Sequence, residues 1–166
     1  MGHSGPVLRL NRLLPALLAA CAAVTAPAAY APSTRPATAA AVTGPLSGRV
    51  IAIDPGHQLG NSRHRAQVGR PVWVGLWKPC NTTGTATDSG FPEATYTWRL
   101  ALRLRRALEA QGATVRLTRT TNSVDDWGPC IDRRGRFGAR VGADLMVSVH
   151  GDGAPSATRG FFVIRP

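Results

Sequence analysis

Lysine is scarce in this sequence, and its scarcity limits the functions to consider. Lys78 is the only lysine among 20 basic residues, so the net charge of +11 rests on arginine. A preference for arginine over lysine is typical of proteins encoded by GC-rich genomes. It is equally typical of surfaces that bind polyanions. The chain also lacks a basic helix with base-reading polar residues, which argues against nucleic-acid binding. The charge therefore indicates a solvated basic surface, with attraction to an anionic cell envelope as the functional alternative.

No apolar run is long enough to span a bilayer. The alanine-rich run at residues 13–24 is too short for that role. Because it follows Arg9 and Arg12 and precedes small-residue cleavage sites, residues 1–31 are predicted to be an export signal. Cys21 ends a segment that resembles a lipoprotein processing box, and its lipidation would add a membrane anchor. We therefore expect an exported protein in an extracellular or periplasm-like space or in the cell wall.

Cysteine is rare, and its three positions fit an oxidising compartment. Cys21 lies in the predicted signal, which leaves Cys80 and Cys130 as an even pair. A bridge between them would close a loop of about 50 residues, worth roughly 4 kcal/mol in the chain-entropy model. Two separate buried thiols are the alternative, but both cysteines follow proline in loop-like sequence, which favours the bridge.

The sequence predicts one α/β domain at residues 46–166, after an Ala/Pro/Thr-rich linker at 32–45. Apolar runs predict strands, and apolar spacings of three and four predict helices. The predicted strands are 50–53, 114–118, 145–149 and 160–164, and the predicted helices are 93–111 and 130–141. This alternation predicts a three-layer αβα architecture with a mostly parallel central sheet. A last helix would be expected after residue 164, so the last helix and strand region is expected to be missing.

A long polar, glycine-rich connection at residues 58–92 separates the first strand from the first helix. A connection of this length is usually functional in a compact domain. Residues 71–77 are predicted to form a small hairpin within it. Trp73 and Trp77 would be either the small core of that hairpin or a surface that stacks on sugar rings.

Three potential metal ligands follow or begin the predicted elements. His57 follows the first strand, His150 follows the strand at 145–149, and Glu93, one of only two glutamates, opens the first helix. Each residue alone has a simpler explanation. A histidine that follows a strand is usually a loop residue, and a glutamate at a helix N-terminus stabilises the helix through its charge. If the strands are parallel, all three meet at one sheet edge, where α/β proteins bind ligands. Two histidines and a glutamate with an open position form a catalytic zinc set.

Two carboxylates flank these histidines and could accept their second ring N–H. Asp54 precedes His57 and Asp152 follows His150, although both also lie in typical turn sequences. His64 lies in an arginine-rich loop and is expected to be exposed.

The motifs resemble those of zinc-dependent N-acetylmuramoyl-L-alanine amidases, closest to the secreted single-domain actinobacterial type, over residues 48–166. The resemblance rests on Ile53-Asp54-Pro55-Gly56-His57, Phe91-Pro92-Glu93, and the segment from Ala143 to Gly153. It implies one Zn²⁺ bound by His57, Glu93 and His150, and a Cys80–Cys130 disulfide. It also implies that Arg133 matches an arginine common in the family.

The resemblance further implies a peptidoglycan hydrolase that acts as a monomer. Such an enzyme cleaves the amide between the lactyl group of N-acetylmuramic acid and L-alanine by means of a zinc-activated water. The family takes its general acid–base from a glutamate well downstream of the second histidine. This sequence has no Asp or Glu after Asp152, so that glutamate is expected to lie beyond Pro166. We therefore expect a C-terminally truncated amidase domain. The alternative is a non-catalytic module of the envelope that binds zinc and muropeptides.

Overall fold

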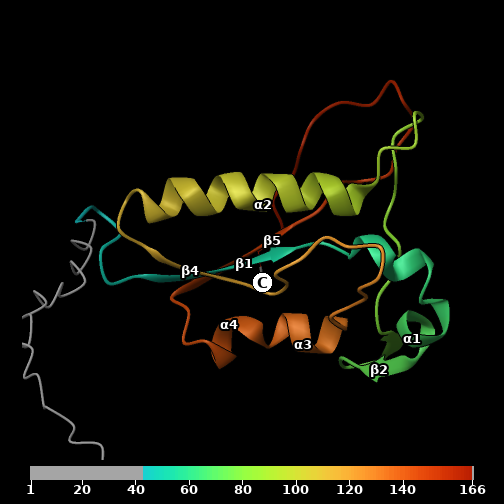
Figure 1. Ribbon diagram of the computed structural model, residues 1–166, viewed down its shortest axis with the longest axis horizontal. Helices are drawn as coiled ribbons and strands as arrows, with labels where there is room; N and C mark the ends of the chain where they lie inside the picture. The colour runs from blue at the N-terminus through green and yellow to red at the C-terminus, as the bar shows by residue number, and fades with distance from the viewer. Residues whose placement is uncertain (1–42, 166) are drawn as a thin grey trace, which may run out of the picture. The chain divides into compact units, whose positions relative to one another are not determined.

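The computed structural model describes residues 43–165 (Figure 1). The predicted export signal at 1–31, with Cys21, and most of the linker at 32–45 lie outside the described residues. Pro166, beyond which the general acid–base glutamate is expected, also lies outside them. Within the described range, no helix combines the length and apolar character needed to cross a membrane.

The centre of the fold is a three-stranded parallel sheet with the order β4-β1-β5. The strands are β1 (Val50–Pro55), β4 (Thr114–Leu117) and β5 (Leu145–Val149). β1 is buried along nearly its whole length, as expected for the central strand of a sheet covered on both faces. It runs two residues further than predicted, because Asp54 and Pro55 still pair with Ser148 and Val149 of β5.

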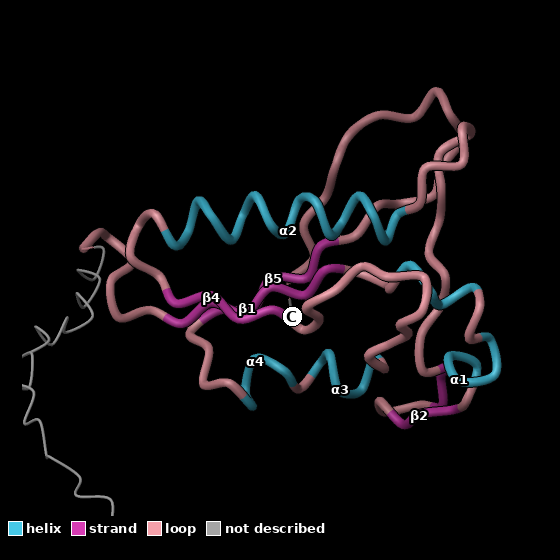
Figure 2. Tube along the Cα trace, in the orientation of Figure 1, coloured by secondary structure: helices cyan, strands magenta, loops and turns pink. Residues whose placement is uncertain are grey.

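Helices cover both faces of this sheet, which confirms the three-layer prediction (Figures 1 and 2). The long helix α2 (Glu93–Glu109) lies on one face, and α3 (Ile131–Gly135) with α4 (Phe137–Arg140) lies on the other. Ala101 of α2 is completely buried against Ile51 and Ile53 in the core. A small side chain at this position lets the helix approach the sheet closely.

The single helix predicted at 130–141 is in fact two short helices. They meet at Arg136, whose φ of −91° and ψ of 0° lie in the bridge region between α and β conformations. Gly138 in α4 packs directly against Met146 of β5, since a Cβ at this glycine would lie 3.2 Å from that side chain. Gly138 therefore lets α4 lie close to β5.

The connection at 58–92 contains more regular structure than its sequence predicts. It holds a 3₁₀ turn η1 (Leu59–Ser62), a short helix α1 (Arg65–Gly69) and the strands β2 (Pro71–Trp73) and β3 (Trp77–Pro79). β2 and β3 form the predicted antiparallel hairpin. The structure also contains the expected Cys80–Cys130 disulfide, which joins the end of this hairpin to the residue before α3.

The strand predicted at 160–164 does not form. These residues have no regular structure, and Phe161, Phe162, Val163 and Ile164 are strongly exposed. Their composition gives high strand propensity, but a strand also needs a partner for its backbone groups. In the described structure, residues 160–164 pair with no strand, and the parallel sheet contains only β4, β1 and β5.

Candidate metal centre

The three predicted ligands meet at one edge of the sheet. His57 and His150 follow β1 and β5, whose last residues, Pro55 and Val149, are partners in the parallel ladder. Oε1 of Glu93, the first residue of α2, lies 3.3 Å from His57 Nε2 and 3.0 Å from His150 Nδ1. One ligand atom from each residue lies within 4.8 Å of the others. The spacing is compatible with a single metal ion bound between them.

The backbone at His57 is held in an uncommon conformation. Its φ of 60° is in the left-handed region, which costs a residue other than glycine on the order of 1–3 kcal/mol. The preceding Gly56 is fixed by two hydrogen bonds: its N–H donates to Val149 O, and its carbonyl accepts the Thr97 hydroxyl. Thr97 is fully buried in α2. The sheet and the helix thus both impose the direction of the His57 side chain.

The hydrogen bonds of His57 favour a cation beside it. Its Nδ1 lies 3.0 Å from the carbonyl of Thr82, which can only accept, so Nδ1 carries the proton. Burial lowers the pKa of His57, and the neutral ring therefore presents a lone pair at Nε2. That lone pair faces the carboxylate of Glu93. Two acceptors at this distance repel each other unless a cation lies between them, so the donor set fits a metal ion.

Backbone amides fix the carboxylate of Glu93. Thr85 N–H donates to Oε2 and Gly151 N–H donates to Oε1, each at 2.9 Å. Burial raises the pKa of Glu93, but these two hydrogen bonds and the neighbouring histidines outweigh it and hold the pKa below its ordinary value. The side chain therefore stays ionised. Gly84 makes this geometry possible, because it has a φ of +78° and a Cβ there would lie 2.7 Å from Oε2.

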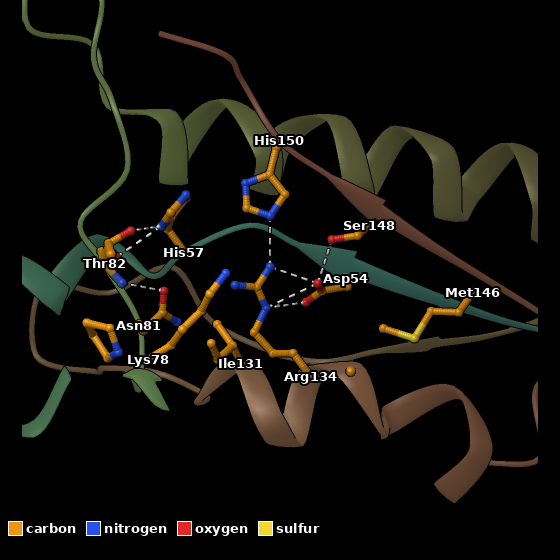
Figure 3. A pocket seen from close by; sticks show the side chains of 12 residues that line it. Asp54, His57, Lys78, Asn81, Thr82, Ile131, Arg134, Met146, Ser148 and His150 are labelled. Carbon is orange, nitrogen blue, oxygen red and sulfur yellow. Dashed lines mark hydrogen bonds and ion pairs between the residues drawn. The ribbon is translucent and has the colours of Figure 1, made fainter. Parts of the chain in front are cut away.

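His150 is oriented by a buried ion pair that the sequence did not reveal (Figure 3). Nη2 of Arg134 lies 3.0 Å from His150 Nε2 and donates to it, so His150 carries its proton on Nδ1 and donates it to Glu93. Arg134 also donates three hydrogen bonds to Asp54, at 2.8 to 3.1 Å. A cation bound through Nδ1 of His150 would have to displace the proton from that nitrogen.

Both predicted partners of the histidine rings need correction. Asp54 contacts neither histidine; it reaches His150 only through Arg134 and also accepts hydrogen bonds from Thr118 and Ser148. Asp152 is exposed and forms no hydrogen bond with either histidine in the described structure. The carbonyl of Thr82, a backbone group without a sequence signal, is the acceptor for His57. Although Asp54 and Asp152 lie near the two histidines in the sequence, neither carboxylate contacts a histidine ring.

The arginine that enters the site is the neighbour of the one that the family resemblance implies. Arg133 is exposed, whereas Arg134 is buried and forms the pair with Asp54. Arg119 is a second buried arginine that sequence reasoning missed. It donates to Pro55 O and Ala94 O, and burial lowers its pKa to about 10. With so many arginines in the chain, composition alone could not distinguish these two.

Two cavities border the three candidate ligands. One, of about 440 Å³, is lined by His57, His150 and Arg134, and Lys78 forms part of its wall (Figure 3). The other, of about 340 Å³, is lined by Glu93 together with residues of the loops at 85–91 and 151–156. His64, which was expected to be exposed, is half-buried; it lines neither cavity, and its Nε2 lies 3.1 Å from the carbonyl of Asp125. A ligand could thus approach the three residues from either side.

Comparison with known proteins decides the family. Residues 51–165 match the family described as N-acetylmuramoyl-L-alanine amidase. The chain belongs to this amidase family. It is 41% identical over 128 residues to N-acetylmuramoyl-L-alanine amidase Rv3717 of Mycobacterium tuberculosis, covering 76% of this chain and 51% of that protein.

Solved structures of amidases share the fold. The N-acetylmuramyl-L-alanine amidase Ami1 of Mycobacterium smegmatis superposes with a TM-score of 0.62 at 37% identity, covering 68% of this chain and 50% of that one. The apo form of Ami1 from Mycobacterium abscessus gives a TM-score of 0.61 at 37% identity, covering 67% of this chain and 51% of that one. The present chain therefore spans about half the length of these relatives.

Proposed function

We propose that this amidase-family chain binds one Zn²⁺ and hydrolyses the amide between the lactyl group of N-acetylmuramic acid and L-alanine in peptidoglycan. The observation that carries the proposal is the convergence of His57, Glu93 and His150, which each offer one ligand atom within 4.8 Å of the others. Bound there, zinc supplies a Lewis acid that activates water and polarises an amide carbonyl. His57, Glu93 and His150 would hold it.

The surrounding residues serve to keep these ligands in place. Thr82 accepts the second N–H of His57, and the amides of Thr85 and Gly151 prevent the carboxylate of Glu93 from turning. Such support is what keeps a metal site in a productive geometry. The cavities on either side leave room for a substrate next to the ligands.

A second candidate is a module that binds zinc and muropeptides without turnover. The observation that favours it concerns Asp54, the one acidic residue lining the larger cavity in the described part of the chain. Burial raises the pKa of Asp54, but the hydrogen bonds and charge of Arg134, with Thr118 and Ser148, outweigh burial and lower it. A carboxylate with a low pKa and all its lone pairs engaged is a poor proton donor. The glutamate expected beyond Pro166 stays a prediction, since that position falls outside residues 43–165.

We further propose that the protein is exported, acts on peptidoglycan as a monomer and is anchored to the membrane only if Cys21 is lipidated. Residues 1–31 would supply the export signal. The mass of the mature N-terminus, determined from the secreted protein, tests this: a start beyond Cys21 without a lipid rules out the anchor.

Metal content and amide cleavage should be measured separately. The first measurement is zinc per chain, for the wild type, His57→Ala and His150→Ala, with His64→Ala as a control histidine outside the site. We expect about one zinc in the wild type and the control, and a loss of tenfold or more in affinity for the two site variants. Unchanged metal content in both site variants would refute the ligand assignment.

The second measurement is the release of L-alanine amino termini from purified peptidoglycan. Zinc binding with release supports the hydrolase. Zinc binding and peptidoglycan binding without release supports the non-catalytic module. Loss of release in His57→Ala, with release retained in His64→Ala, would connect the activity to this site.

A further inference from the structure

Two tryptophans are exposed side by side on the hairpin of β2 and β3. Trp73 and Trp77 are cross-strand partners, and their ring centroids are 5.4 Å apart with an interplanar angle of 65°. Trp73 is 57% exposed and Trp77 is 67% exposed. The hairpin is too small to bury them, so the interpretation of this pair as a small core is wrong. Each ring instead supports the other and leaves much of its surface open to solvent.

The hairpin is firmly attached to the domain. Cys80 follows β3 directly; its N–H donates to Arg70 O at 2.8 Å, and its sulfur forms the disulfide with Cys130. The carbonyl of Cys80 accepts the N–H of Ile131, the first residue of α3, at 2.7 Å. The aromatic pair therefore has a fixed position relative to α3 and the rest of the site. Binding to a fixed aromatic surface costs little conformational entropy.

The same strand leads from the tryptophans into the larger cavity. Lys78 and Pro79, the two residues after Trp77, line this cavity together with His57. Because side chains alternate along a strand, Pro79 lies on the same face of the hairpin as Trp77. Pro79 therefore connects the hairpin face that carries Trp77 to the wall of this cavity, which the tryptophans themselves do not line.

The segment that contains the hairpin is basic, which suits an anionic polymer. Residues 58–87 contain three arginines and Lys78, but no Asp or Glu. Stem peptides of peptidoglycan carry free carboxylates, so this segment would attract them, while the tryptophans offer flat apolar faces. A polymer with both sugar rings and carboxylates matches both properties.

We propose that Trp73 and Trp77 form a platform on which sugar rings of the glycan strand stack, on the hairpin whose last residues line the cavity of the candidate metal centre. This proposal rests on the proposed function, because the lactyl group is a short arm that must keep the sugar close to the amide being cleaved. The C–H faces of pyranose rings pack well against indole rings, which are large, rigid and lose little entropy on binding. The platform thus binds the glycan part of the substrate, separately from the peptide.

The test is binding to glycan strands from which the stem peptides have been removed, measured by co-sedimentation with the full chain. The variants are Trp73→Ala, Trp77→Ala and the double variant. Leu76→Ala, an apolar residue of the same hairpin that is 54% exposed, is the matched control. We expect each tryptophan variant to bind about 3–10-fold more weakly, the double variant more weakly still, and the control within about twofold of the wild type. Circular dichroism and zinc content should be the same in all five proteins.

Three outcomes would refute the proposal. The wild type does not bind glycan, the double variant binds as well as the wild type, or the tryptophan variants lose glycan binding only in proportion to the fraction of unfolded protein. A wild type that dimerises while the double variant stays monomeric would also overturn it, because the tryptophans would then form an interface between copies. Failure of the proposed function is distinguishable, since a chain without zinc or amide cleavage can still bind peptide-free glycan through Trp73 and Trp77.

Discussion

Removing either side chain of the Asp54–Arg134 pair should destabilise the protein more than any exposed ion pair would. The side chains are only 4% and 8% exposed, and three hydrogen bonds join them. Arg134→Met leaves a buried carboxylate whose remaining partners are the hydroxyls of Thr118 and Ser148. Asp54→Asn leaves a buried guanidinium beside a second buried cation, Arg119.

The expected loss for each single variant is about 3–5 kcal/mol, the usual cost of leaving one buried charge unpaired. For a domain of this size such a loss corresponds to a decrease in Tm of about 10–20 °C. The double variant, Asp54→Asn with Arg134→Met, removes both charges together. Its loss should be smaller than the sum of the single losses by about 2–3 kcal/mol.

Urea unfolding followed by circular dichroism gives the free energies for this cycle. The control is Arg105→Met, the same substitution at the exposed Arg105–Glu109 pair of α2. It should cost about 0.5 kcal/mol or less. If Arg134→Met costs no more than Arg105→Met, or if the single losses add without coupling, the buried pair does not stabilise the fold as argued. Weaker zinc binding by Arg134→Met would show in addition that the pair orients His150.

Particular contacts lead to three further predictions. Cys80→Ser, which removes the disulfide to Cys130, should lower the free energy of unfolding by about 4 kcal/mol, as measured by urea unfolding, with reduced wild type giving the same loss. Gly84→Ala should weaken zinc binding about tenfold or more, as measured by isothermal titration calorimetry. Gly84 has a left-handed backbone conformation, and the added Cβ would crowd the Glu93 carboxylate. Unchanged zinc affinity would contradict the close approach of Gly84 to Glu93. The pKa of Asp54 is lower in the folded than in the unfolded state. The stabilising effect of its carboxylate is therefore complete at neutral pH and disappears as the pH falls below about 4. Between pH 5 and pH 3, Asp54→Asn should lose less free energy of unfolding than the wild type, as measured by urea titrations.

Much of the fold could be predicted because local patterns decide it. The apolar run that begins β1 and the helical spacing of α2 were predicted from the sequence, and both elements form. The segment at 160–164 has an equally strong strand pattern and forms no strand, because the pattern describes propensity and not the presence of a neighbouring strand. The predicted helix at 130–141 is divided at Arg136, a break that apolar spacing does not predict.

The candidate site also has a part that the sequence predicts and a part that it does not. His57, Glu93 and His150 could be brought together from sequence, because parallel strands and the helix after them place their ends at one edge. The supporting residues could not. Neighbouring positions on a helix point about 100° apart, so whether Arg133 or Arg134 reaches Asp54 depends on how α3 is rotated against the sheet.

The sequence by itself determined the family, the parallel αβα layers and the three residues of the candidate metal centre, since motifs, periodicity and strand polarity are properties of the chain. Only the tertiary structure decided that Asp54 pairs with Arg134, that the carbonyl of Thr82 sets the protonated nitrogen of His57, and that Trp73 and Trp77 are exposed. These features depend on how elements distant in sequence pack together. Burial and hydrogen-bond partners are fixed only when that packing is complete.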